Sequence, residues 1–183
     1  KYMNLKDRIA DVLLELVKKK SIDKITIKNI VEQCGITRQS FYYHFSDIFN
    51  LIEWIMQREF RRLLAEISQY DDQKQCVKRL LESTYEKRGL MQRLTNTKEQ
   101  GTVIRSLINT TGEFLKRIAN PKMISNISAA ELDMTLNFYS FAITGFILGL
   151  HNHMGPDMER AADHLLKLIR GESLLIPDQS VLS

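Results

Sequence analysis

The sequence predicts an all-α protein, with an N-terminal three-helix helix-turn-helix domain followed by a C-terminal helical bundle. Three observations lead to this fold class. Apolar residues recur at helical spacing along most of the 183 residues, only 3 Pro and 8 Gly are present, and residues 26–45 form two short helical patterns separated at Gly35. We expect the domains to span residues 1–46 and 47–171, with residues 172–183 as a tail.

Residues 4–20 predict the first helix. A run of three lysines at 18–20 suits its C-terminal end, where cations complement the helix dipole. The same lysines could reach a phosphate, but a solvated helix end is the favoured interpretation. The apolar stripe of this helix consists of Leu5, Ile9, Val12, Leu13, Leu16 and Val17.

The helix-turn-helix pattern begins at Thr26, whose hydroxyl is suited to cap the second helix. Gly35 can adopt the left-handed conformation that ends this helix, and Thr37 is the next N-cap candidate. Phe41 and Phe45 are four residues apart, so they share one face and can hold the short third helix against the domain. The buried face of the second helix is predicted to hold Ile27, Ile30, Val31 and Cys34.

The third helix starts with residue types that suit contact with DNA. Arg can donate two hydrogen bonds to guanine, and Gln can form two with adenine. Hydroxyl and ammonium groups bond phosphate oxygens well. The alternative is a plain helical hairpin with solvated faces, and the aromatic run 41–45 together with the Thr caps favours the DNA-binding interpretation.

This stretch resembles the DNA-binding domain of the TetR family of bacterial transcriptional regulators. The family pattern matches Thr26, Gly35, Ile36, Thr37 and the aromatic run 41–45. The match extends over roughly residues 5–55, with a polar link and an early Leu in the fourth helix. The family commonly has a Lys at the position of Ile48, so one expected phosphate contact is in doubt. The residues 42–45 and 52–54 and the Phe- and Tyr-rich helix also resemble the subgroup that includes the activator of dihydroxyacetone kinase operons.

The resemblance implies DNA contacts for nine residues of the helix-turn-helix. Phosphate contacts are implied for Thr26, Lys28, Thr37, Tyr42 and His44. Base reading is implied for Arg38, Gln39, Ser40 and Tyr43. His44 has an equal alternative as a packed or surface histidine. The resemblance further implies a homodimer on a near-palindromic operator, whose DNA affinity is controlled by a small-molecule or protein effector.

The charge distribution agrees with a polyanionic partner for the N-terminal third. Residues 1–62 hold 12 Lys and Arg against 8 Asp and Glu, whereas residues 63–183 hold 14 against 14. The whole net charge of +4 therefore lies beside the helix-turn-helix. Because this surplus is modest, one copy is expected to bind DNA weakly and two copies to bind more tightly.

Residues 47–68 predict a long fourth helix, and residues 73–118 predict two or three more, with Gly89, Gly101 and Gly112 as candidate breaks. In the family the fourth helix joins the DNA-binding domain to a regulatory domain. A ligand pocket is expected among the middle helices, although for any single candidate lining residue a place in the core is the favoured interpretation. These candidates are Tyr85, Met91, Phe114, Met134, Phe138 and Phe141.

Residues 128–154 predict a helix that starts with a capping box at Ser128 and Glu131. Its run from 138 to 150 is apolar nearly all round, but is too short to cross a membrane, so most faces must be buried. A second subunit is the favoured source of part of that burial, and a monomer core is the alternative. With the last helix, which starts at Asp157, the predicted dimerisation residues are Phe138, Phe141, Ile143, Gly145, Phe146, Gly149, Leu150, Leu165 and Ile169.

No constellation for catalysis is found, so we expect neither an enzyme nor a cofactor. His151 and His153 are two residues apart and point to different sides of a helix, so we expect no metal site. Cys34 and Cys76 form no disulfide or metal pattern, which fits a reducing cytoplasm. The sequence begins at Lys1 without a signal-peptide pattern, and we expect a few residues to precede it.

The primary hypothesis is a sequence-specific, homodimeric regulator of transcription that binds double-stranded DNA and no membrane. The alternative is a helical protein-interaction module or co-regulator that binds DNA weakly or not at all. Ile48 and the small basic surplus favour this alternative slightly. The operator, the target genes, the effector and the direction of regulation do not follow from the sequence.

Overall fold

The computed structural model describes residues 4–98, 100–118, 127–150 and 157–172, and the regular elements in these ranges are all helical, which confirms the predicted fold class. The N-terminal part contains α1 (Leu5–Lys19), η1 (Ile22–Lys24), α2 (Ile27–Cys34) and α3 (Arg38–His44). It is followed by α4 (Ile48–Ile67), α5 (Gln73–Glu86), α6 (Arg88–Thr95), α7 (Gln100–Ile118), α9 (Ala129–Leu150) and α10 (Met158–Ile169). In the described ranges, none of the helices has the length and apolar character needed to span a bilayer.

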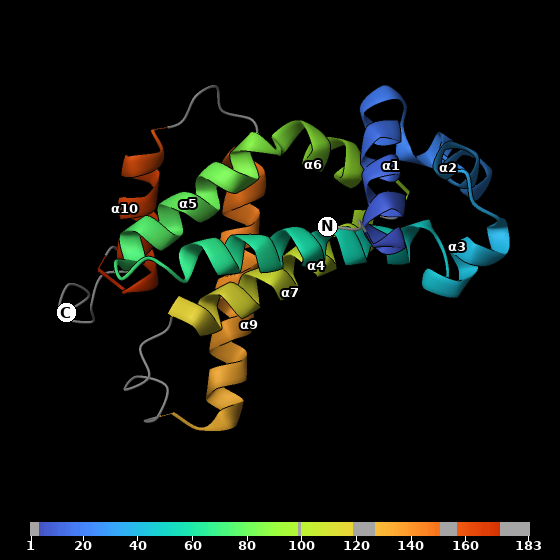
Figure 1. Ribbon diagram of the computed structural model, residues 1–183. Helices are drawn as coiled ribbons and strands as arrows, with labels where there is room; N and C mark the ends of the chain where they lie inside the picture. The colour runs from blue at the N-terminus through green and yellow to red at the C-terminus, as the bar shows by residue number, and fades with distance from the viewer. Residues whose placement is uncertain (1–3, 99, 119–126, 151–156, 173–183) are drawn as a thin grey trace.

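Two hydrophobic cores share the long helix α4, which runs through the middle of the molecule (Figure 1). The first core is built mainly from α1 to α4 and includes Leu13, Phe41 and Leu51, and α6 and α7 add Leu94 and Val103 to it. The second lies among α4, α5, α7, α9 and α10 and includes Leu81 and Phe114. Because α4 contributes side chains to both cores, a change in its tilt must move the two halves of the molecule relative to each other.

Two of the three glycines predicted as breaks among the middle helices lie at the start of a helix, and the third does not. Gly89 and Gly101 lie in the first turns of α6 and α7, and Gly112 lies inside α7, so the prediction of a break at Gly112 is wrong. A Cβ atom at Gly112 would lie 3.1 Å from Ser140 Oγ on α9. The absence of a side chain at Gly112 therefore allows α7 and α9 to approach each other closely.

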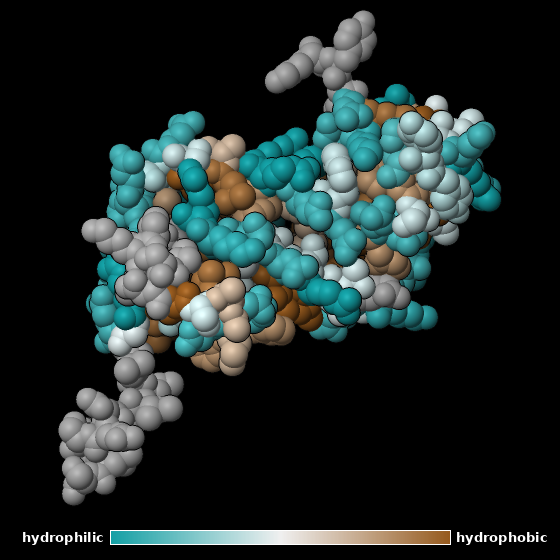
Figure 2. All heavy atoms as spheres, turned by 90° about the horizontal axis from the view of Figure 1, so that it is seen from below, coloured by the Kyte–Doolittle hydropathy of each residue, from teal (hydrophilic) through white to brown (hydrophobic). Residues whose placement is uncertain are grey.

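Helix α9 starts as predicted, because Ser128 and Glu131 form a reciprocal capping box with distances of 2.8 and 3.2 Å. Its apolar run is only partly covered by the rest of the chain. Met134, Phe138 and Phe141 are 73, 69 and 62% exposed and lie on one side of the helix, and we call these three residues the α9 strip. The space-filling view from below shows hydrophobic side chains gathered on the surface of the C-terminal part (Figure 2).

Ion pairs join α10 to α5. Glu159 lies 2.9 Å from Lys74 Nζ and 2.8 Å from Lys78 Nζ. Hydrogen bonds from these two lysines lower the pKa of the Glu159 carboxyl to about 2. The side chain of Asp157 caps the start of α10, as predicted, by accepting from the backbone N–H of Arg160. Helix α10 is thus fixed on α5 by contacts at its N-terminal end.

Candidate nucleic-acid interface

The start of α2 is fixed by a capping box. The Thr26 hydroxyl accepts from the backbone N–H of Asn29, and the Asn29 side chain accepts from the backbone N–H of Thr26, with distances of 3.3 and 3.1 Å. The same Asn29 oxygen also accepts from Lys20 Nζ at 2.8 Å. Thr26 is the N-cap that the sequence predicts, whereas the role of Asn29 was missed. The signal that could have found it is a side-chain amide three residues after the cap.

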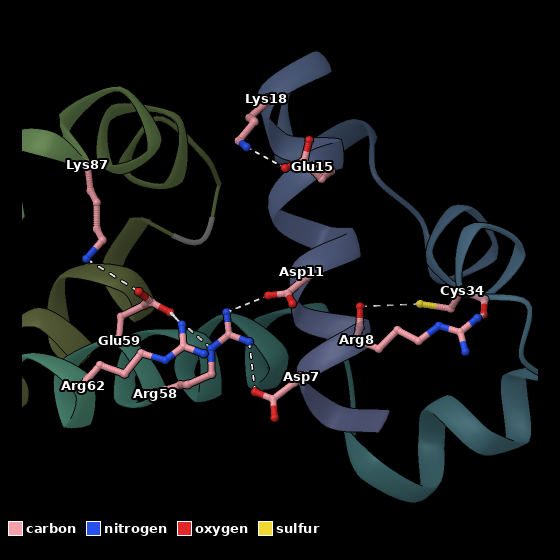
Figure 3. A network of polar contacts seen from close by, with 10 residues as sticks. All are labelled: Asp7, Arg8, Asp11, Glu15, Lys18, Cys34, Arg58, Glu59, Arg62 and Lys87. Atoms are coloured by element: carbon pink, nitrogen blue, oxygen red, sulfur yellow. Dashed lines mark hydrogen bonds and ion pairs between the residues drawn. The ribbon is translucent and has the colours of Figure 1, made fainter. Parts of the chain in front are cut away.

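The turn between α2 and α3 depends on Gly35, which has a φ of +64°. The backbone N–H of Ile36 donates to the carbonyl of Val31 at 3.0 Å, which closes the end of α2. The Arg8 guanidinium on α1 donates to the carbonyl of Cys34. In the other direction, the dashed line in Figure 3 joins the Cys34 thiol to the Arg8 carbonyl, 4.0 Å away. The turn is therefore joined directly to α1, a contact that residue spacing within the turn could not reveal.

Helix α3 is short, and two buried rings hold it in place. Thr37 caps it by accepting from the backbone N–H of Ser40 at 3.1 Å. Phe41 is fully buried, with its ring centroid 5.9 Å from that of Phe45, which in turn lies 5.8 Å from the Trp54 ring on α4. Seven residues are too few for a stable isolated helix, so these ring contacts determine where its outer face points.

The outer face of α3 carries the polar and aromatic side chains proposed to bind DNA. Tyr43 is 84% exposed and Tyr42 is 56% exposed. His44 is half-buried, with its ring centroid 5.0 Å from that of Tyr43. None of the nine predicted DNA contacts is buried, because Ser40 and His44 are half-buried and the other seven are exposed, namely Thr26, Lys28, Thr37, Arg38, Gln39, Tyr42 and Tyr43.

Ile48, the residue that departs from the family pattern, is half-buried against the N-terminal core. Its neighbour Asp47 caps α4 by accepting from the backbone N–H of Asn50 at 2.8 Å. The beginning of α4 thus presents a carboxylate and an apolar side chain where the family commonly has a cation. The start of α4 is therefore formed normally, but it lacks the positive charge that the family commonly has at this position.

A groove of about 580 Å³ lies between α4, α7 and α9 in the C-terminal domain. Most of the residues that line it are polar or charged, including Gln57, Arg61, Asn109 and Asn137. Ser106 also lines it, and this side chain is 8% exposed with a hydroxyl that has no hydrogen-bond partner among the described residues. A ligand in this groove would contact α4 directly.

The six residues predicted to line a ligand pocket are not brought together. Phe114 is buried in the C-terminal core, and Met91 packs against the N-terminal core. The Tyr85 ring lies 4.2 Å from the guanidinium carbon of Arg88, and Met134, Phe138 and Phe141 form the exposed α9 strip. None of the six lines the groove between α4, α7 and α9.

The described members of the predicted dimerisation set divide into exposed, half-buried and buried residues. Phe138, Phe141, Gly145 and Gly149 are exposed, whereas Phe146 and Ile169 are half-buried. Ile143 and Leu165 are buried in the C-terminal core of their own chain, and the Leu150 side chain lies outside the described residues. The two buried side chains therefore support the helices from within, and only the exposed group is available to another molecule.

In the described ranges, no three His, Cys, Asp or Glu side chains gather closely enough to hold a metal ion. His151 and His153 lie outside those ranges, and His164 is exposed on α10. Burial raises the pKa values of both the Cys34 and Cys76 thiols, so neither has the character of a reactive thiolate.

Comparison with known proteins gives a match for the N-terminal domain and fold similarities over nearly the whole chain. Residues 9–53 match the protein family described as "Bacterial regulatory proteins, tetR family". No curated protein matches the sequence.

Solved structures share the fold at low sequence identity. The dihydroxyacetone kinase operon activator DhaS has a TM-score of 0.67 at 18% identity, covering 92% of this chain and 95% of its own. A TetR transcriptional regulator from Rhodococcus sp. RHA1 has a TM-score of 0.61 at 15% identity, covering 90% and 94%. FadR from Thermus thermophilus, a repressor solved in complex with lauroyl-CoA, has a TM-score of 0.57 at 16% identity, covering 94% and 97%.

Proposed function

Because this chain belongs to the TetR family of transcriptional regulators, we propose that it is a sequence-specific DNA-binding regulator of transcription. It acts as a homodimer on a near-palindromic operator, and an effector bound in the C-terminal domain controls its DNA affinity. The helix-turn-helix domain spans residues 1–46, the regulatory and dimerisation domain spans 47–171, and the tail spans 172–183.

The observation that carries this proposal is the outer face of α3. Arg38, Gln39, Tyr42 and Tyr43 are exposed together on a helix that is capped at Thr37 and held by buried rings. Exposed large aromatic side chains are costly to leave in water, and a rigid helix of this kind has the size to enter a major groove. Arg38 and Gln39 read base edges, while Thr26, Lys28, Thr37, Tyr42 and His44 contact phosphates.

Dimerisation through α9 and α10 is supported by the α9 strip. Three large apolar side chains exposed on one helix face form the kind of patch that marks an interaction site. Gly145 and Gly149 continue this side of α9 without side chains, so a second helix can approach closely. Leu168 on α10 is also more than one-third exposed. A second copy covers these residues and places two α3 helices on one DNA duplex.

The effector is proposed to bind in the groove between α4, α7 and α9. Its occupant lies against Gln57 and Arg61, which are on the helix that joins both cores. Binding there changes the tilt of α4 and, through it, the separation of the two α3 helices. The lining is more polar than the six residues predicted from the sequence, which favours an effector with several hydrogen-bonding groups.

The test of DNA binding is the selection of bound sequences from random duplex DNA, followed by affinity measurements at increasing salt. A dimer that neutralises several phosphates releases their counterions, so its affinity falls steeply and linearly on logarithmic axes. We expect a two-fold symmetric motif whose half-sites lie about 10 base pairs or a multiple apart. A folded dimer that enriches no sequence at any salt concentration would refute the proposal, unless an effector restores binding.

The second candidate is a helical protein-interaction module with weak or no DNA binding. Ile48, half-buried where the family commonly has a phosphate-binding Lys, favours it. The salt series separates the two candidates, because contact through apolar side chains depends little on salt, whereas phosphate contact depends on it strongly.

The groove assignment predicts the behaviour of two matched tryptophan variants on α7. Asn109 is exposed and lines the groove, whereas Arg105 is exposed on the same helix outside it. A ligand at 100 times its Kd stabilises the folded state by about 2.7 kcal/mol. We expect small molecules that raise the melting temperature of the wild type to lose this effect in Asn109→Trp and keep it in Arg105→Trp. Equal shifts in both variants would place the effector elsewhere.

A further inference from the structure

Arg58 on α4 is the only charged side chain that is buried among the residues the structure describes, and it is 6% exposed. Its guanidinium donates to Asp7 on α1 at 3.1 Å, to Asp11 on α1 at 2.9 Å and to the adjacent Glu59 at 3.2 Å. The Trp54 ring lies 5.4 Å from the guanidinium carbon. Figure 3 shows Asp7 and Asp11 pointing from α1 toward Arg58 on α4. We call Asp7, Asp11, Arg58 and Glu59 the Arg58 cluster.

The ion pairs of the Arg58 cluster are suited to hold α1 and α4 in one relative arrangement. Asp7 and Asp11 are four residues apart, so one face of α1 presents both carboxylates to a single planar guanidinium. Burial acts to lower the pKa of Arg58, but its hydrogen bonds to Asp11 and Asp7 raise the pKa above its usual value, so the cation is retained. A buried ion pair generally adds little net stability compared with apolar packing, whereas it favours one arrangement of the charged groups.

The cluster joins the two halves of the molecule. Helix α1 is bonded to the turn of the helix-turn-helix through Arg8 and Cys34, so α3 follows the position of α1. On the other side, Glu59 also accepts from Arg62 at 2.9 Å and lies 3.6 Å from Lys87 Nζ, between α5 and α6.

A second contact between the two halves acts in parallel with the cluster. Arg93 on α6 donates to the carbonyl of Val17 at the end of α1 at 2.9 Å. Besides apolar packing, the C-terminal domain therefore makes polar contacts with α1 near both ends of that helix. A change at the junction of α5 and α6 can thus reach α1 without passing through the apolar core.

We infer that Arg58 is a positioning residue, which fixes the angle between α1 and α4 and thereby transmits changes in the C-terminal domain to α3. Asp7, Arg58 and Glu59 lie outside residues 9–53, the segment that matches the family, and of the cluster only Asp11 lies within it. The inference rests on the proposed function only for its effect on DNA, since the fixed angle itself is a property of the folded chain.

The experiment measures the distance between the two domains by pulsed electron spin resonance. Spin labels are attached at Tyr43→Cys on α3 and Gln75→Cys on α5, both at exposed positions. Cys34 and Cys76 are buried thiols with raised pKa values and are expected to stay unlabelled. Labelled chains are diluted with unlabelled wild type, so that distances within one chain dominate.

The test variant is Arg58→Met, and its control is Arg62→Met. Arg62 lies one turn further along α4, is exposed and bonds Glu59, but does not reach α1. We expect a single narrow distance distribution for the wild type and for Arg62→Met, and loss of that narrow peak for Arg58→Met with unchanged helix content. Arg58→Lys keeps the charge without the fork of donors and should restore the peak in part.

If Arg58→Met does not fold, the double variant Asp7→Asn, Asp11→Asn carries the test, since it leaves the guanidinium and the apolar packing in place. A narrow wild-type distribution in the folded test variant overturns the inference. Where an operator is known, its affinity should fall by roughly 5- to 150-fold in Arg58→Met, the usual range of coupling between sites, with unchanged base preference. Failure of the wild type to bind DNA would refute the proposed function and leave the distance result valid.

Discussion

Replacing Phe41 by alanine is expected to destabilise the N-terminal domain by about 3–5 kcal/mol and to abolish specific DNA binding. The Phe41 side chain is fully buried between α3 and the rest of the first core, and its ring contacts Phe45. Its removal leaves a cavity that a helix of seven residues has too few other contacts to close. The free energy of unfolding, measured by urea titration of the wild type and the variant, gives the size of the effect.

Tyr43→Ala is the matched control for Phe41→Ala. Tyr43 is an aromatic residue of the same helix but is 84% exposed, so its truncation should change the stability by no more than about 0.5 kcal/mol. A similar loss in both variants would show that α3 is not held by its buried rings. A loss of less than about 1 kcal/mol in Phe41→Ala would contradict the packing described here.

Arg38→Ala is expected to reduce discrimination between operator and unrelated DNA by about 1–3 kcal/mol, which is the value of one bidentate contact with a base. Arg38 is exposed in the first turn of α3, and its neighbour Gln39 is exposed as well. Because phosphate contacts remain in this variant, its affinity for random DNA should change little. Binding to the selected operator and to a scrambled duplex, at equal salt, measures the difference.

Lys28→Ala is expected to lower the affinity for DNA of any sequence, in contrast to the loss of sequence discrimination in Arg38→Ala. Lys28 is exposed on α2 and lies 3.7 Å from Glu32, a weak ion pair that leaves the ammonium group accessible to phosphate. Its removal should weaken binding to all DNA about equally and reduce the salt slope by about 1. If Arg38→Ala and Lys28→Ala had the same effect on both duplexes, the division into base-reading and phosphate-binding residues would be wrong.

The features of the fold that could be predicted from the sequence are helix caps and turns, which depend on contacts between residues three or four positions apart. Thr26 and Thr37 cap their helices, Gly35 adopts the left-handed conformation, and Ser128 forms a capping box, all as the local spacing predicts. In each of these cases the partner of the side chain is a backbone group of the same or the next turn. Such contacts can be predicted without knowledge of how the helices pack.

The parts that do not follow depend on contacts between distant segments. Arg58 bonds residues 47 and 51 positions earlier in the chain, and nothing in the spacing of α1 or α4 identifies it as buried. Gly112 looks like a helix break in the sequence, but its role is to admit Ser140 of α9.

Which face of α9 is buried and which is exposed could not be predicted from the sequence either. This helix is apolar on nearly all sides from 138 to 150, so its periodicity does not separate Ile143, which is buried in its own chain, from Phe141, which is exposed. The groove between α4, α7 and α9 was not predicted, because most of its residues are polar or charged and a pocket was sought among aromatic residues and methionines.

Dimerisation through the α9 strip, as proposed, would make the abundance of the protein part of its control. If these three exposed side chains are covered only by a second copy, the folded dimer gains stability as the chain concentration rises. The number of assembled pairs then increases with the square of the number of free chains. A cell with few copies would leave most operators empty, and a modest rise in synthesis would fill them, before any effector enters the groove.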